Sequence, residues 1–394
     1  MGQLPDIVIV GAGIVGAACA EALSAAGFVV DVLDRGAPAA GTTASGEGNV
    51  LVSDKPPGAE LRLAQASRRR WPELVRKLRE ELGDIADFEW EAKGGVVAAT
   101  TVDGAEALTA FAAEQRDAGV DAQVLPSGAV FDLEPHLTRD TSLAVHYPED
   151  AQVQPVLAAS ALLAAVRRRG GTVRSATRAT GVLLGRDGRV TGVRTDGGSL
   201  SCGAVVNACG PWAGDFASSA GAPIAVLPRR GMVLVTAPVP PGTVRHKVYD
   251  ADYVGAVESG DAELQTSTVV ESTQAGTVLI GSSRERIGFD DTVRMHVLRE
   301  MARKAAVLFP VLGQVPVLRA YGGFRPYAPD HLPVIGADPR VAGLWHATGH
   351  EGAGVGLAAA TGQLLAELFT GTPPHVDPKP FRVDRPELIE EVGA

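Results

Sequence analysis

The stretch "DIVIVGAGIVGAACAEALSAAGFVVDVLDR" (residues 6–35) decides the fold, because a strand, a glycine-rich turn, a helix and a second strand follow one another directly. The apolar, β-branched run at residues 7–10 is typical of a strand that is buried on both faces of a parallel sheet. Asp34 ends the second strand, where a carboxylate can accept hydrogen bonds from a ribose. The stretch therefore predicts an α/β fold that binds an adenine dinucleotide, and it leaves open whether that is NAD(P) or FAD.

Three glycines after the first strand fit the pattern GxGxxG, and they are Gly11, Gly13 and Gly16. The first permits a tight turn, the second lets the backbone approach a pyrophosphate, and the third lets the helix pack close to the strand. The pyrophosphate would accept hydrogen bonds from free N–H groups at the helix N-terminus. A lone glycine motif occurs in many loops, but the strand, helix and acid in order favour the nucleotide site.

The chain has 394 residues, of which 45% are hydrophobic and 21% charged, and its net charge is −10. This composition is ordinary for a soluble globular protein, and the length allows two domains. Without a basic excess to replace phosphate counterions, we expect no nucleic-acid partner. Three scattered cysteines, Cys19, Cys202 and Cys209, indicate buried thiols rather than a disulfide framework or a metal site. No uninterrupted apolar run reaches the roughly 18 residues of a membrane span, so we expect no transmembrane segment and a cytoplasmic location.

The remaining chain has helix-rich and strand-rich parts. Helices are expected at residues 60–82, 103–118 and 155–169. Short strands separated by turn signals from residue 172 onwards predict a meander. Residues 228–283 are strand-like with little helix, unlike the βαβ pattern of the first stretch. This contrast predicts a second domain inserted between pieces of the first.

The last third of the chain bears on the choice of cofactor. The stretch "LWHATGHEGAGVGLAAATGQLLAELFTG" (residues 344–371) contains a strand, a glycine-rich turn and a helix of small and apolar residues. Such a turn presents several N–H groups and a helix N-terminus to an electron-rich group. A nucleotide site in the first 35 residues and a second helix N-terminus here suit the long, extended FAD better than NAD(P).

Several further segments carry a family resemblance that covers nearly the whole chain. They are "GTTASGEGNV" (41–50), "EDAQVQP" (149–155), "VVNACGPWA" (205–213), "GFRP" (323–326), "DHLPVIG" (330–336), "ATGHEGAGVGLA" (347–358) and "FRVDR" (381–385). With the first glycine motif, their order resembles the FAD-dependent D-amino acid oxidase superfamily. The similar branch holds glycine oxidase, the sarcosine oxidase β subunit, and the β subunits of hydrogen cyanide synthase, opine oxidase and D-hydroxyproline dehydrogenase.

The resemblance implies a Rossmann-like FAD-binding domain and a discontinuous α+β substrate domain built on an antiparallel sheet. The expected FAD-binding domain consists of residues 1–86, 146–224 and 318–394, and the substrate domain of residues 87–145 and 225–317. Monomeric sarcosine oxidases attach FAD to a cysteine at the position of Gly323. Because this chain has glycine there, we expect non-covalent FAD.

The residues expected to contact FAD come from five segments of the chain. They are Gly11, Gly13, Ile14, Val15, Gly16, Asp34, Arg35, Thr42, Thr43, Gly46, Gly48, Asn49, Ala179, Gly210, Trp212, His350, Glu351, Gly352, Ala353, Gly354, Val355 and Gly356. The resemblance implies that Thr42 and Thr43 lie near phosphate oxygens and that residues 350–356 lie beneath the flavin pyrimidine. Two alternatives stay open: residues 41–49 as an ordinary polar loop, and His350 as a histidine of the core.

Two residues are implied to bind the substrate carboxylate. Arg325 matches an arginine that holds the carboxylate with its bidentate fork, and Tyr253 matches a tyrosine that hydrogen-bonds the same group. The alternatives are a structural salt bridge for Arg325 and an ordinary strand tyrosine for Tyr253. Glycine oxidase has a second arginine where this chain has Gly352, so the pocket has room for a larger or N-substituted amino acid.

The resemblance implies an FAD-dependent enzyme that oxidises the C–N bond of a small amino or imino acid to an imine by hydride transfer to flavin N5. O2 or a partner then reoxidises the flavin. The sequence shows no required general base and no nucleophilic triad or metal cluster. The alternatives are a 2-hydroxy-acid oxidase and a catalytic β subunit that needs companion subunits. The substrate, its stereochemistry, the electron acceptor and the oligomeric state, including a homo-oligomer, stay open.

Overall fold

The computed structural model describes residues 5–251 and 262–390, and a six-stranded sheet holds the glycine motif. Its order is β18-β19-β12-β1-β2-β8, with bounds Val334–Ala337, Leu344–Thr348, Ala204–Asn207, Ile7–Val10, Val30–Leu33 and Thr172–Arg174. β1 pairs in parallel with both β2 and β12, and only β18 runs antiparallel to its neighbour. The predicted α/β fold with a parallel sheet is therefore confirmed.

Long helices pack beside this sheet. They are α1 (Ile14–Ala25), α2 (Ala59–Leu82), α5 (Pro155–Arg168) and α9 (Gly354–Thr370). α1 contacts both α5 and α9, and α2 contacts α9. A Cβ atom on Gly362 of α9 would lie 2.5 Å from the Ala18 carbonyl oxygen, so only glycine permits this approach of α9 to α1. Residues 351–370 are long and apolar enough to span a membrane, and 61% of the most apolar stretch is buried against the rest of the protein.

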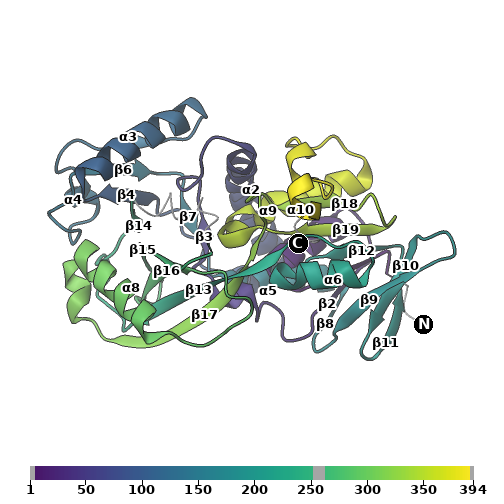
Figure 1. The fold of residues 1–394 in the computed structure, drawn as a ribbon. Helices are drawn as coiled ribbons and strands as arrows, with labels where there is room; N and C mark the ends of the chain where they lie inside the picture. Colours follow the sequence, from purple (N-terminus) through teal and green to yellow (C-terminus); the bar gives the residue numbers. More distant parts are fainter. Residues whose placement is uncertain (1–4, 252–261, 391–394) are drawn as a thin grey trace.

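The second large sheet has eight strands and lies beside the first (Figure 1). Its order is β17-β13-β16-β15-β14-β4-β6-β5, with bounds Val317–Tyr327, Leu227–Thr236, Val278–Arg284, Gln265–Ser272, Lys247–Asp250, Gly95–Ala99, Leu143–Tyr147 and Gln123–Val124. All pairs are antiparallel except β14 with β4. α3 (Val102–Asp117) and α8 (Met295–Leu308) flank this sheet.

Helix α8 is an element that the sequence reading did not predict. It buries apolar side chains in one core cluster with β13, and they are Val297, Leu298, Met301, Ala305 and Leu308. These apolar positions recur at three- and four-residue intervals, which is the signal of an amphipathic helix. The periodicity was therefore available in the sequence.

Smaller elements complete the fold. The predicted meander is a three-stranded sheet of β9 (Ala179–Leu184), β10 (Val190–Thr195) and β11 (Gly198–Ser201), and β3 (Asn49–Val50) pairs with β7 (Ala151–Gln152). The short helices are α4 (Val130–Leu133), α6 (Ala213–Ser219), α10 (Pro386–Glu390), η1 (Thr42–Ser45), η2 (Gly83–Ala86), η3 (Gly210–Trp212), η4 (Pro310–Gln314), η5 (Glu351–Ala353) and η6 (Lys379–Phe381). The domain boundaries stay a prediction, and β17 pairs along its length with β13 of the eight-stranded sheet.

Candidate functional site

A cavity of about 650 Å³ is lined by residues of both large sheets. This volume lies within the range of cofactor and small-ligand sites. Nineteen of the residues expected to contact FAD line it: Gly11, Gly13, Ile14, Val15, Gly16, Asp34, Arg35, Thr42, Thr43, Gly46, Asn49, Ala179, Gly210, Trp212, His350, Glu351, Gly352, Gly354 and Val355. Arg325 lines it as well, and Tyr253 lies outside the described residues.

The turn between β1 and α1 forms one end of the cavity. Gly11 has a φ of +110°, and a Cβ atom there would lie 2.2 Å from the Ala208 carbonyl oxygen. The first N–H groups of α1 have no partner within the helix, and that of Ile14 donates to Thr43 Oγ1 at 3.0 Å. This glycine turn and helix N-terminus fit a pyrophosphate, as the GxGxxG pattern predicts.

Asp34 fixes the turn from the side of β2. Its Oδ2 accepts the N–H of Ala12 at 2.9 Å, and its Oδ1 accepts the N–H of Gly36 at 2.8 Å. An ionised carboxylate has about four acceptor sites, so each oxygen can still accept a ribose hydroxyl. Asp34 therefore has a structural task that the sequence reading did not include.

An aromatic stack lines the cavity near Asp34. The Arg35 guanidinium carbon lies 3.8 Å from the centroid of the Trp212 ring. Trp212 also stacks on Phe289, with the centroids 5.3 Å apart and the planes at 4°. The positive charge of Arg35 is thus held over an aromatic face on the cavity lining.

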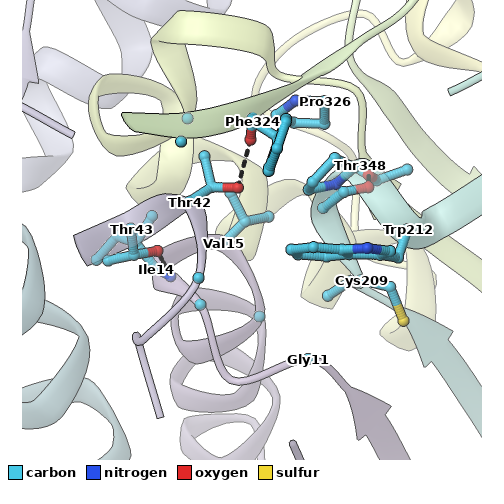
Figure 2. A pocket seen from close by; sticks show the side chains of 18 of the residues that line it. Gly11, Ile14, Val15, Thr42, Thr43, Cys209, Trp212, Phe324, Pro326 and Thr348 are labelled. Carbon is cyan, nitrogen blue, oxygen red and sulfur yellow. Dashed lines mark hydrogen bonds between the residues drawn. The ribbon is translucent and has the colours of Figure 1, made fainter. Parts of the chain in front are cut away.

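The segment 41–49 is tied to β17 across the cavity. The Thr42 hydroxyl donates to the Phe324 carbonyl at 2.6 Å (Figure 2), and the Ser45 hydroxyl donates to the Gly322 carbonyl at 3.1 Å. A Cβ atom on Gly323 would lie 2.3 Å from Ser45 Cβ, so that position has no room for a side chain. These contacts fix the segment to β17 of the eight-stranded sheet, and its role beside FAD stays a prediction.

Three of the residues expected to contact FAD are not on the cavity lining: Gly48, Ala353 and Gly356. Gly48 has a φ of +99°, and a Cβ atom there would lie 1.9 Å from the Val153 carbonyl oxygen. The Gly356 carbonyl accepts the Trp71 indole N–H at 3.2 Å. The structure therefore gives Gly48 and Gly356 packing tasks beside the cavity.

His350 is both buried in the core and on the cavity lining. Its Nε2 lies 2.9 Å from the Thr361 hydroxyl, and only 2% of the residue is exposed. Burial lowers the pKa of His350 to about 3, so the ring is neutral at physiological pH. His350 is thus a residue of the core, and its place beneath a flavin stays a prediction.

Glu351, with a φ of +46°, is held by two side chains that the sequence reading missed. Oε1 accepts from the buried Arg229 at 2.5 Å, and Oε2 lies 3.1 Å from His331 Nδ1. Burial opposes ionisation, but the contacts with His331 and Arg229 outweigh it and lower the pKa of Glu351. Glu351 is therefore ionised, and its backbone is fixed in the turn that precedes α9.

Arg325 projects from β17 across the eight-stranded sheet. Its Nη1 donates to the Ser283 carbonyl of β16 at 2.8 Å. The guanidinium lies over Gly231 of β13, where a Cβ atom would lie 2.2 Å from Nη1. Nη1 also lies 3.5 Å from the Arg230 carbonyl oxygen, so backbone carbonyls of β13 and β16 orient the guanidinium on the cavity lining.

Two more charged residues of the cavity lining were missed, and both come from segments far from Arg325 in the sequence. Arg284 of β16 is 4% exposed, and its Nη1 lies 3.2 Å from the Ser282 hydroxyl. Glu47 lies in the segment that joins η1 to β3. Glu47 belongs to the quoted segment 41–50 but was not singled out within it, and Arg284 comes to the cavity through the pairing of β16 with β13.

The comparisons with known proteins agree with this architecture. The family model described as "FAD dependent oxidoreductase" matches residues 6–368. Hydrogen cyanide synthase subunit HcnC of Pseudomonas aeruginosa is 29% identical over 98% of this chain and 97% of its own length. Glycine oxidase of Pseudomonas putida is 30% identical over 95% of this chain and 97% of its own.

A solved structure extends the agreement to three dimensions. The crystal structure of glycine oxidase from Geobacillus kaustophilus superposes with a TM-score of 0.87 and 27% sequence identity. The match covers 97% of this chain and 99% of that one. The two proteins therefore share the whole fold, including both large sheets.

Proposed function

The chain belongs to the family of FAD-dependent oxidoreductases, and from this premise we propose that it oxidises the C–N bond of a small amino or imino acid to an imine. The observation that carries the proposal is Arg325, whose guanidinium lines the same cavity as the nucleotide turn. A guanidinium in this cavity can bind a substrate carboxylate through two parallel hydrogen bonds. The glycine oxidases among the relatives are named for such a substrate.

FAD is the cofactor of this family, and the residues of the cavity fit it. The α1 N-terminus would hold the pyrophosphate, Asp34 the ribose, and the turn 350–355 the flavin. When bound, FAD supplies the acceptor for a hydride. We expect it to be non-covalent, because Gly323 leaves no room for a side chain that could be attached to it.

In the proposed reaction the substrate carbon loses a hydride and the nitrogen loses a proton, so that a C=N bond forms. Water then hydrolyses the imine to a keto acid and ammonia, or to a keto acid and an amine where the nitrogen is substituted, or a cyclic imine leaves intact. Arg325 holds the carboxylate, and orientation of the C–H bond is the main contribution of the protein. A Cβ atom on Gly352 would lie 3.7 Å from Arg325 Cδ. Because glycine has no side chain there, the pocket has room for an amino acid larger than glycine.

A screen of the purified holoenzyme tests the proposal. Amino, imino and 2-hydroxy acids are mixed with it without oxygen, and bleaching of the flavin absorbance is followed. We expect bleaching by an amino or imino acid. Bleaching by 2-hydroxy acids alone would replace the proposal with a hydroxy-acid oxidase. Acid precipitation of the same protein should release the flavin, and flavin left in the precipitate would contradict the non-covalent expectation.

A second candidate follows from the match to HcnC, which is named as a subunit of a larger enzyme. In that case this chain would be the catalytic subunit of a dehydrogenase that passes electrons to a companion subunit. Flavin bleaching by an amino acid without turnover in air would favour this candidate. Turnover in air with O2 consumption would favour an oxidase. A cytoplasmic location is part of either proposal.

A further inference from the structure

We propose that Glu47 binds the amino group of the substrate and thereby selects amines over 2-hydroxy acids. The inference rests on the proposed function, and it concerns a residue of the segment 41–50 that was not among the residues expected to contact FAD or substrate. It assigns to one cavity both charges that an amino acid requires: a cation for its carboxylate and an anion for its amine.

Glu47 and Arg325 lie over neighbouring strands of one sheet. A Cβ atom on Gly281 of β16 would lie 2.0 Å from Glu47 Oε1, and a Cβ atom on Gly231 of β13 would lie 2.2 Å from Arg325 Nη1. β13 and β16 are paired, and both charged side chains line the cavity. The two glycines thus allow an anion and a cation to lie flat on adjacent strands.

One oxygen of Glu47 is held and the other is not. Oε2 accepts Asn49 Nδ2 at 3.1 Å and lies 3.6 Å from Lys247 Nζ. Oε1 is buried, and no hydrogen-bond partner for it is found in the described part of the chain. The side chain is 9% exposed, so water reaches it poorly. A buried acceptor without a donor is costly, and a ligand N–H is the group that would satisfy it.

The chemistry of the substrate favours this assignment. An amine nitrogen carries N–H donors whether it is protonated or neutral, and an ammonium adds a full charge opposite to that of Glu47. A 2-hydroxy acid offers a single neutral O–H donor in the same place. The carboxylate therefore discriminates between the two substrate classes by charge, while Arg325 binds both.

Glu271 provides a matched control. It lies 3.3 Å from the same Lys247 Nζ, and its side chain is fully buried. It is absent from the cavity lining, whereas Glu47 is on it. If Glu47→Gln alters flavin reduction only through the contact with Lys247, Glu271→Gln should alter it equally. If Glu47→Gln acts through the substrate, Glu271→Gln should have no such effect.

The experiment compares wild type, Glu47→Gln and Glu271→Gln holoenzymes in anaerobic flavin reduction. The substrates are the amino acid that reduces the wild type fastest and its 2-hydroxy analogue. For Glu47→Gln we expect a loss of about tenfold or more in efficiency with the amino acid, mainly in apparent substrate affinity. The analogue should bind to both proteins equally, as measured by its perturbation of the flavin spectrum. Glu271→Gln should stay near wild type with both compounds.

Each other outcome has a defined meaning. Equal reduction of wild type and Glu47→Gln by the amino acid would overturn this inference and leave the proposed function intact. Equal losses in both glutamine variants would also overturn it, because the effect would then act through Lys247. A wild type that no amino or imino acid reduces would overturn the proposed function itself. If Glu47→Gln does not retain flavin, Glu47→Asp replaces it, with weaker amine binding and unchanged binding of the analogue as the expected result.

Discussion

The two ends of the cavity are built in different ways. The nucleotide end consists mainly of backbone from one contiguous segment, with Gly11, the α1 N-terminus and Asp34 within 24 residues. The other end, which we propose for the substrate and call the substrate end, consists of side chains from separate segments. Strand pairing and the path of residues 41–49 bring Glu47, Arg284 and Arg325 to this one cavity. A site made of backbone depends on local conformation, whereas a site made of side chains depends on the tertiary fold.

This difference predicts different responses to substitution. At the nucleotide end, a new side chain should damage folding and cofactor binding together, because it displaces backbone. At the substrate end, a removed side chain should alter the reaction while FAD and stability remain. The following changes test that contrast, from the largest expected effect to the smallest.

The largest effect is expected for Gly11→Ala. At a φ of +110°, a Cβ atom would lie 2.2 Å from the Ala208 carbonyl oxygen. Backbone strain and steric overlap should together lower the free energy of unfolding by roughly 3 kcal/mol or more. We expect loss of FAD and of most folded protein, measured by flavin content and thermal unfolding.

Gly27→Ala is the control for Gly11. Gly27 has a similar φ of +95° but no atom within 4 Å of a Cβ atom. In Gly27→Ala the strained backbone should lower the free energy of unfolding by only about 1–2 kcal/mol, and the variant should retain FAD. Equal losses in the two variants would mean that φ alone, and not the contact with Ala208, constrains the nucleotide turn.

Arg325→Ala should follow, with a loss in the efficiency of flavin reduction. Removal of a desolvated charge pair with the substrate carboxylate costs roughly 2–5 kcal/mol, which corresponds to about thirty-fold or more. Arg325→Lys should recover part of it, because an ammonium lacks the planar fork. The measurement is anaerobic reduction by the true substrate.

FAD content and melting temperature should stay near wild type in both Arg325 variants. Early unfolding with a normal rate in the remaining holoenzyme would make Arg325 a structural residue. Arg284→Ala sharpens the assignment, since Arg284 lines the same cavity. A larger loss there than at Arg325 would move the carboxylate site to β16.

Asp34→Ala should weaken FAD binding by about tenfold or more, since hydrogen bonds to a charged group contribute about 1.5–3 kcal/mol. The same carboxylate holds the N–H groups of Ala12 and Gly36. Asp34→Asn retains one acceptor oxygen and should lose less. Equilibrium titration of the apoprotein with FAD measures both, and unchanged affinity in Asp34→Ala would contradict the ribose assignment.

The smallest effect is expected for Glu271→Gln, as a change in the pH dependence of stability. Burial raises the pKa of Glu271 from 4.5 to about 7. The folded state therefore binds the Glu271 proton more tightly than the unfolded state does. This binding adds to the free energy of unfolding in full below pH 4.5, and the addition is lost as the pH rises through about 7. Melting temperatures across this range should fall less steeply in the variant, and identical slopes would refute the raised pKa.

The sequence could predict the nucleotide end because its signals are local. Gly11, Gly16 and Asp34 stand at fixed distances within one βαβ unit, and α5 (Pro155–Arg168) follows proline and glycine signals at its ends. Arg325 was found only by resemblance to a family. Glu47 and Arg284 were missed, because the register of β13 with β16 and the path of residues 41–49 bring them together, and no short-range pattern encodes these features.

The order of strands in the six-stranded sheet has a consequence for synthesis of the chain. β19 is separated from β2 by about 310 residues, yet it belongs to the same sheet, and the turn that follows it lines the cavity. At roughly 5–20 residues per second, a ribosome needs about 15–60 s to cover that distance. During this interval the glycine turn has left the ribosome without the strands that complete the cavity. Loading of flavin is therefore expected late in translation, and a retained flavin would report that synthesis has passed β19.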